Sequence, residues 1–210
     1  MRAELVTAAA MIALMLTANT TCAAMPAGTV EGVSGLCTIS GRPAHEGDAV
    51  QARDTIATPA DGTIKLQMAD RSVLTVAPRS TMTVMRVEWT GGARDAQLAL
   101  TQGLLRLSVP AVAGSSGYTV WTAAGPAMMK SAAAEWFVAA DARSTQVGVL
   151  EGKVTLTSPV NNRSVAIPGH WGTRLEIGLS PVLPRTWGQV EFDSFIQRTQ
   201  CCQSPVPKPQ

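Results

Sequence analysis

Residues Thr63-Ile64-Lys65-Leu66-Gln67-Met68 alternate between polar and apolar side chains. Successive side chains of a strand point to opposite faces, so this alternation predicts a strand with one buried face. Ala69-Asp70-Arg71-Ser72 reads as a tight turn, and Val73-Leu74-Thr75-Val76 as the next strand. The three segments together predict an antiparallel hairpin.

The same period of two continues from about Val30 to Ile177, with Gly, Pro or Asp between short apolar runs. Strands of about five residues that recur every 8 to 14 residues are typical of an all-β fold. Ala123 to Ala134 is rich in Ala, but Gly125-Pro126 near its start favours a turn and a strand over a helix. We therefore predict an all-β fold, a twisted, sandwich-like β-solenoid or roll built from many short strands.

Composition limits the possible function. The chain has 210 residues, of which 46% are hydrophobic and 15% are charged, and its formal net charge is +2. Such a chain buries a sizeable core, and its small charge does not indicate a nucleic-acid partner. Composition also excludes a coiled coil, a collagen-like rod and a polytopic membrane protein.

The N-terminus has the layout of a secretory signal peptide. Leu5 to Leu16 is apolar but too short to span a bilayer stably, and small residues follow it. We expect residues 1–24 to be removed, with cleavage after Ala24 or, as a second choice, after Ala27, which places the mature chain in the periplasm. An uncleaved anchor and acylation of Cys22 are the alternatives.

Three cysteines remain after such cleavage: Cys37, Cys201 and Cys202. Neighbouring cysteines rarely bond to each other, so we expect a disulfide from Cys37 to Cys201 or Cys202. Metal or redox chemistry at the pair is the alternative, although no second CxxC or nearby His supports it.

The C-terminal segment does not continue the strand pattern of the rest of the chain. Residues 181–200 contain a short proline linker and then an amphipathic helix, and the tail at 201–210 reads as disordered. The apolar face of this helix carries Trp187, Phe192, Phe195 and Ile196. We expect this face to dock on the β domain, and an exposed partner-binding helix is the alternative.

An ordered series of segments resembles a FecR-type domain. It runs from Gly47-Asp48-Ala49-Val50 through Asp61-Gly62-Thr63-Ile64-Lys65-Leu66 and Leu98-Ala99-Leu100-Thr101-Gln102-Gly103-Leu104-Leu105-Arg106 to Val147-Gly148-Val149-Leu150-Glu151-Gly152-Lys153-Val154 and Val165-Ala166-Ile167-Pro168-Gly169. The resemblance extends over about residues 28–180. One departure is that Lys130-Ser131-Ala132-Ala133-Ala134 replaces the family's Arg-Gly-Thr or Arg-Ser-Thr triplet before Glu135-Trp136, so any contact of that Arg is in doubt.

The resemblance implies a periplasmic module that relays signals. In full-length regulators of this type, the domain receives a signal from an outer-membrane siderophore receptor, and a cytoplasmic segment binds a sigma factor. About four residues precede the apolar run of this chain, so we do not expect it to be an anti-sigma regulator itself. It resembles the stand-alone secreted members, which implies a scaffold or accessory role with an envelope protein partner.

No catalytic or cofactor signature stands out in the sequence. His45-Glu46-Gly47-Asp48 offers potential metal ligands but reads better as a turn with a capping Asp. We expect no enzyme activity, no cofactor and no metal. The second hypothesis is a carbohydrate- or peptidoglycan-binding module that uses exposed tryptophans, and it requires two or more of them on one face. The candidates are Trp89, Trp121, Trp136, Trp171 and Trp187.

Overall fold

The computed structural model describes residues 25–114 and 116–201. The expected signal peptide at 1–24, the Cys22 alternative and the tail from residue 202 onward lie outside the described residues. Among the helices that the structure describes, none has the length and apolar character needed to cross a membrane.

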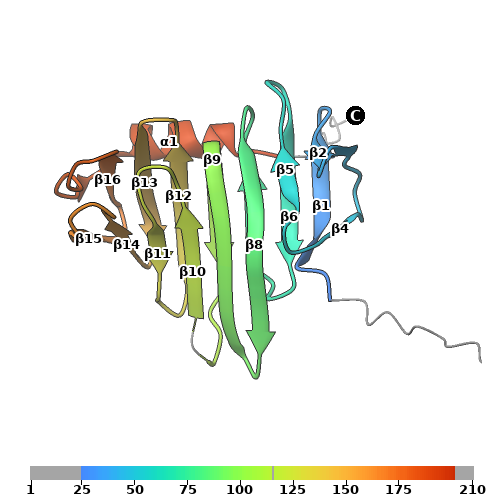
Figure 1. The fold of residues 1–210 in the computed structure, drawn as a ribbon, viewed down its shortest axis with the longest axis horizontal. Coiled ribbons are helices and arrows are strands. Elements are labelled where there is room, and N and C mark those ends of the chain that lie inside the picture. Colours follow the sequence, from blue (N-terminus) through green and yellow to red (C-terminus); the bar gives the residue numbers. More distant parts are fainter. Residues whose placement is uncertain (1–24, 115, 202–210) are drawn as a thin grey trace, which may run out of the picture.

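The described chain folds into strands and one short helix, which follows the last strand (Figure 1). The elements are β1 (Gly28–Ser34), β2 (Thr38–Ile39), β3 (Arg42–Pro43), β4 (Ala49–Val50), β5 (Thr55–Ala57), β6 (Thr63–Met68), β7 (Val73–Val76), β8 (Thr81–Thr90), β9 (Ala93–Val109), β10 (Ser116–Trp121), β11 (Ala127–Met129), β12 (Ala134–Ala140), β13 (Ser144–Glu151), β14 (Lys153–Thr157), β15 (Ser164–Pro168), β16 (Trp171–Glu176), β17 (Arg185–Thr186) and α1 (Gln189–Arg198).

Hydrogen-bond pairing arranges these strands in two layers that share β9. The first layer runs in the order β4, β1, β6, β7, β9, β12, β13, β16, β17. The second runs in the order β3, β2, β5, β8, β9, β10, β11, β14, β15. Within the described residues, no pairing joins the outer strands of the two layers, so the sheet stays open.

Strand β9 passes from one layer to the other at Gly103. Residues before it pair with β8 and β10, and residues after it pair with β7 and β12. The positions that face the main core change from even-numbered residues such as Leu98 to odd-numbered residues such as Leu105. Gly103 makes this change because its φ of +99° is one that residues with a Cβ rarely adopt.

The main core fills the space between the two layers. Apolar residues from both layers, including Leu66, Leu107, Leu98 and Val154, are completely buried there. A smaller core lies on the outer face of the first layer, where Phe137 of β12 packs under α1. In Figure 1, α1 crosses behind β9, β12 and β13.

The all-β prediction and the short C-terminal helix are confirmed. Ala123 to Ala134 forms turns and the short strand β11, as the Gly-Pro pair predicted. One expectation differs in detail, because β9 is a single strand of 17 residues, whereas the sequence pattern predicts strands of about five. Glycine at position 103 bends this strand without ending it. The pairings describe an open two-layered sheet and do not establish the regular coil of a solenoid.

Replacing Gly103 with Ala tests this bend. A Cβ at position 103 would lie 2.1 Å from Ser80 Oγ and 2.5 Å from Ser80 Cα. Because both the backbone strain and this overlap oppose the side chain, we expect G103A to lower the free energy of unfolding by more than about 2 kcal/mol in urea titrations.

Gly178 is the matched control for this substitution. Its φ is +80°, but no atom lies within 4 Å of its Cβ position. We expect G178A to cost only the backbone strain, about 1 kcal/mol. Equal losses for G103A and G178A would show that contact with Ser80 does not hold the bend.

Candidate functional site

One end of the two-layered sheet is organised around the side chain of Arg94. Arg94 occupies an inward-facing position near the start of β9, in line with Ala96 and Leu98. Its side chain is 1% exposed and forms an ion pair with the equally buried Asp70, with 3.2 Å between Nη1 and Oδ2. Asp70 belongs to the turn between β6 and β7, so this ion pair joins two strands of the first layer to β9.

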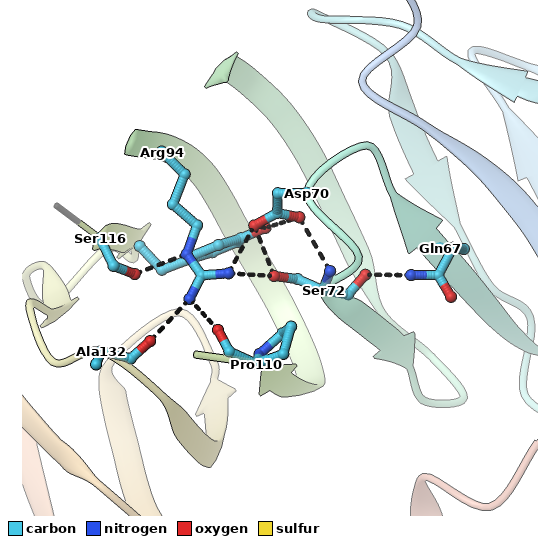
Figure 2. A network of polar contacts seen from close by, with 8 residues as sticks. Gln67, Asp70, Ser72, Arg94, Pro110, Ser116 and Ala132 are labelled. Atoms are coloured by element: carbon cyan, nitrogen blue, oxygen red, sulfur yellow. Dashed lines mark hydrogen bonds and ion pairs between the residues drawn. The ribbon is translucent and has the colours of Figure 1, made fainter. Parts of the chain in front are cut away.

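All five N–H donors of Arg94 have acceptors (Figure 2). Nε donates to Ser116 Oγ at 2.6 Å, and Nη1 donates to Asp70 and, at 3.4 Å, to Ser72 Oγ. Nη2 donates to the carbonyl oxygens of Pro110 and Ala132. These acceptors come from the turn before β7, the loop after β9, the start of β10 and the turn before β12.

Asp70 is likewise saturated with donors. It accepts the backbone N–H of Ser72 at 3.0 Å, the Ser72 hydroxyl at 2.7 Å and the Tyr118 hydroxyl at 3.0 Å. Burial, and next the nearby Asp70 charge, raise the pKa of Tyr118 far above its usual range. Tyr118 therefore stays protonated and acts as a donor. The buried charges neutralise each other, which suits a structural role.

An open pocket of about 470 Å³ lies at this end of the sheet, and Asp70 forms part of its lining. The lining is mostly apolar and comprises Ala69, Asp70, Arg71, Trp89, Gly92 and the loop 110–113. This loop approaches the β8–β9 turn closely, because a Cβ on Gly114 would lie 2.7 Å from Gly92 O. The buried ion pair thus fixes a turn that lines the pocket.

Trp89 and Trp121 are the two clearly exposed tryptophans of the described residues, at 42% and 43%. Trp89 lies opposite the inward-facing Arg94, so it projects from the inner face of the second layer. Trp121 lies opposite Ala99, which alternates with the buried Leu98 and Leu100, so it projects outward. The two rings therefore do not share a face, as a sugar-stacking platform would require.

The residues predicted to make the C-terminal interaction lie together on the sheet. Phe192 and Phe195 are buried, and Trp187 and Ile196 pack beside them. Trp187 stacks on Phe195 with 5.4 Å between ring centroids, and Phe195 stacks on Phe137 of β12 at 5.6 Å. This aromatic face thus covers the outer side of the first layer.

Two glycines make room for Trp187. A Cβ on Gly172 would lie 2.0 Å from Trp187 Cε2, and a Cβ on Gly148 would lie 2.4 Å from Cζ3. The two glycines are directly paired between β13 and β16.

The start of α1 is fixed by a carboxylate. Arg185 and the Gly188 N–H both bind the Glu191 carboxylate at 2.5 Å, which holds the pKa of Glu191 below its usual range.

The expected disulfide from Cys37 does not form in the structure. Cys37 is a free, buried thiol that donates to Ser34 O at 3.2 Å, and burial raises its pKa. Cys201 is disulfide-bonded, and Cys202 lies outside the described residues. The Cys37 thiol lies close to Gly62, because a Cβ on Gly62 would lie 3.0 Å from Cys37 Sγ.

The other polar residues that the sequence analysis singled out bind neighbouring backbone or side-chain groups. Asp48 Oδ2 accepts the backbone N–H of His45 at 2.8 Å, as expected for a capping turn. No group of three or more metal-binding side chains occurs within residues 25–114 and 116–201. Glu135 pairs with Arg106 of the neighbouring β9, so the acidic residue that follows the missing family triplet has a cation from another strand.

Sequence reasoning missed the Arg94 network. The sequence predicts the turn that contains Asp70, but not the partners of its carboxylate, because Arg94 and Tyr118 lie 24 and 48 residues away in the chain. One signal was available: Arg94 lies two residues before Ala96, so it falls on the same face of the strand as the inward-facing Ala96 and Leu98. A charged residue at such a position needs a buried partner.

Comparison with protein families identifies the part of the chain that contains this network. Residues 54–155 match the model of the FecR protein family. This stretch of the chain resembles a FecR domain. The matched span begins at β5 and ends in β14, so the FecR-like region includes β9 and the whole Arg94 network but not α1.

Solved structures share the fold. Two crystal structures of a candidate anti-sigma factor from Parabacteroides distasonis ATCC 8503 match with TM-scores of 0.55 and identities of 16% and 15%. Each match covers 68% of this chain and 64% of the other, so this chain spans less than two thirds of their length. No curated protein matches the sequence.

Replacing Asp70 with Asn tests the network. The change removes the charge that neutralises Arg94 at 1% exposure. We expect D70N to lower the free energy of unfolding by about 3 to 5 kcal/mol, the usual cost of breaking a buried ion pair from one side. The measurement is chemical denaturation followed by circular dichroism.

An exposed ion pair provides the control for D70N. Arg86 pairs with Asp95 on the outer face of the second layer, where both side chains are more than 40% exposed. We expect R86Q to cost less than about 1 kcal/mol. If D70N proves as mild as R86Q, the buried network does not hold this end of the sheet.

Truncating Trp187 to Ala tests the docking of α1. The indole stacks on Phe195 and fills the space over Gly172. We expect W187A to lower stability by about 3 kcal/mol, with a clear drop in Tm by calorimetry. Val190 lies on the same helix but is 83% exposed, and V190A is expected to leave the Tm within about 1 °C. A Tm for W187A as high as that of V190A would contradict the docking.

Proposed function

We propose that this protein is a non-catalytic, periplasmic FecR-type interaction module that acts as a scaffold or accessory in cell-envelope signalling. The observation that carries the proposal is the FecR-like region at residues 54–155, whose rigid buried network fixes an open, tryptophan-lined pocket. A saturated buried ion pair has no donor or acceptor left for a substrate, but it holds surface loops in fixed positions.

Two further features support this proposal. The signal-peptide pattern at residues 1–24 supports export. The aromatic face of α1 is buried on the sheet, so the interaction surface lies elsewhere on the module. The P. distasonis proteins are described as candidate anti-sigma factors.

Site-specific photo-crosslinking in the native cell tests the proposal. A photoreactive residue at position 89 or 121 samples the two exposed tryptophan sites, and one at the buried position 137 serves as the silent control. We expect a mature N-terminus at Met25 or Gly28 by mass spectrometry, periplasmic fractionation, and a crosslink to a defined envelope protein. An intact Met1 in the cytoplasmic fraction, or a crosslink to a sigma factor, would contradict the proposal.

A further inference from the structure

We propose that the Trp89 pocket binds an extended segment of a partner protein in which an apolar side chain stands next to carboxylates. The inference rests on the proposed function for its assumption that the occupant is a protein. The occupant's chemistry follows from the walls of the pocket and from the one charge at its rim.

The walls favour an apolar side chain. Trp89 is 42% exposed, although its strand partner Arg94 lies in the buried network. Ala69 and the Pro110–Ala113 loop supply further apolar surface, and the volume of about 470 Å³ lies within the range of ligand pockets. An exposed indole beside such a cavity is typical of the anchor points of protein interfaces.

The charge at the rim favours an acidic partner. The ionisable side chains that line the pocket are Asp70 and Arg71. Asp70 is neutralised by Arg94, so it does not repel a carboxylate. Arg71 is exposed, and none of the ion pairs within residues 25–114 and 116–201 involves it. Its guanidinium is therefore available for a carboxylate.

Backbone geometry keeps Arg71 at this rim. Its φ is +67°, in the left-handed region, and the turn around it is closed by the bonds of Ser72 to Asp70. Because the turn is tied to Arg94, the backbone that carries Arg71 is held at the rim before a partner arrives. Such preorganisation lowers the entropic cost of binding.

The test uses two blocked tripeptides, Glu-Phe-Glu and Lys-Phe-Lys, titrated into the folded protein by calorimetry and by NMR of the indole N–H resonances. We expect Glu-Phe-Glu to bind more tightly and to shift the Trp89 resonance but not that of Trp121. W89A is expected to weaken binding on the order of tenfold, as for an interface anchor. W121A is the matched control, since Trp121 is equally exposed but lies on the other face.

A charge reversal separates a real site from non-specific attraction. R71E is expected to reverse the preference, so that Lys-Phe-Lys binds more tightly, while R163E, at a distant exposed arginine, leaves it unchanged. Absence of binding, equal loss in W89A and W121A, or an unchanged preference in R71E would each overturn the proposal. A crosslink to an envelope protein from another position, together with these failures, would leave the proposed function standing and the pocket excluded.

Discussion

The whole architecture depends on one close contact, between Gly103 and Ser80. Ser80 Oγ accepts the N–H of Leu104 at 3.0 Å, and Ser80 N–H donates to Thr58 Oγ1 at 2.9 Å. The bend at Gly103, which we call the corner, turns β9 so that its first half belongs to one layer and its second half to the other. Every strand pairing that links the two layers runs through β9, and the main core exists because β9 brings the layers together.

Arg94, near the start of β9, complements this corner in the middle of the strand. The corner acts by steric fit, whereas Arg94 acts by collecting loops from both layers around one buried guanidinium. A buried charge is costly unless it is paired, and here the hydrogen bonds that satisfy Arg94 also fix the Asp70–Ser72 turn and the loop at Pro110, which line the pocket. The Arg94 side chain thus both holds the loops together and fixes those that line the pocket.

Much of this fold could be predicted from the sequence, because alternation and turn residues are local signals. The hairpin at Thr63–Val76 and the helix after Trp187 follow from such signals. The bend at Gly103 could not be predicted, since a glycine in a strand pattern is also compatible with a turn. The partners of Arg94 are dispersed over many residues, and no local pattern reveals which distant groups meet. The same holds for the slot of Gly148 and Gly172, whose purpose becomes evident only with Trp187 above it.

Because both layers share β9, this strand also affects how the protein unfolds. The strands β7, β8, β10 and β12 all pair with β9, so both layers depend on this one strand. Melting either half of β9 removes strand neighbours from one layer and opens the common core. We therefore expect the two layers to unfold as a single cooperative unit, and the amides in the middle of β9 to exchange with solvent only through unfolding of the entire domain.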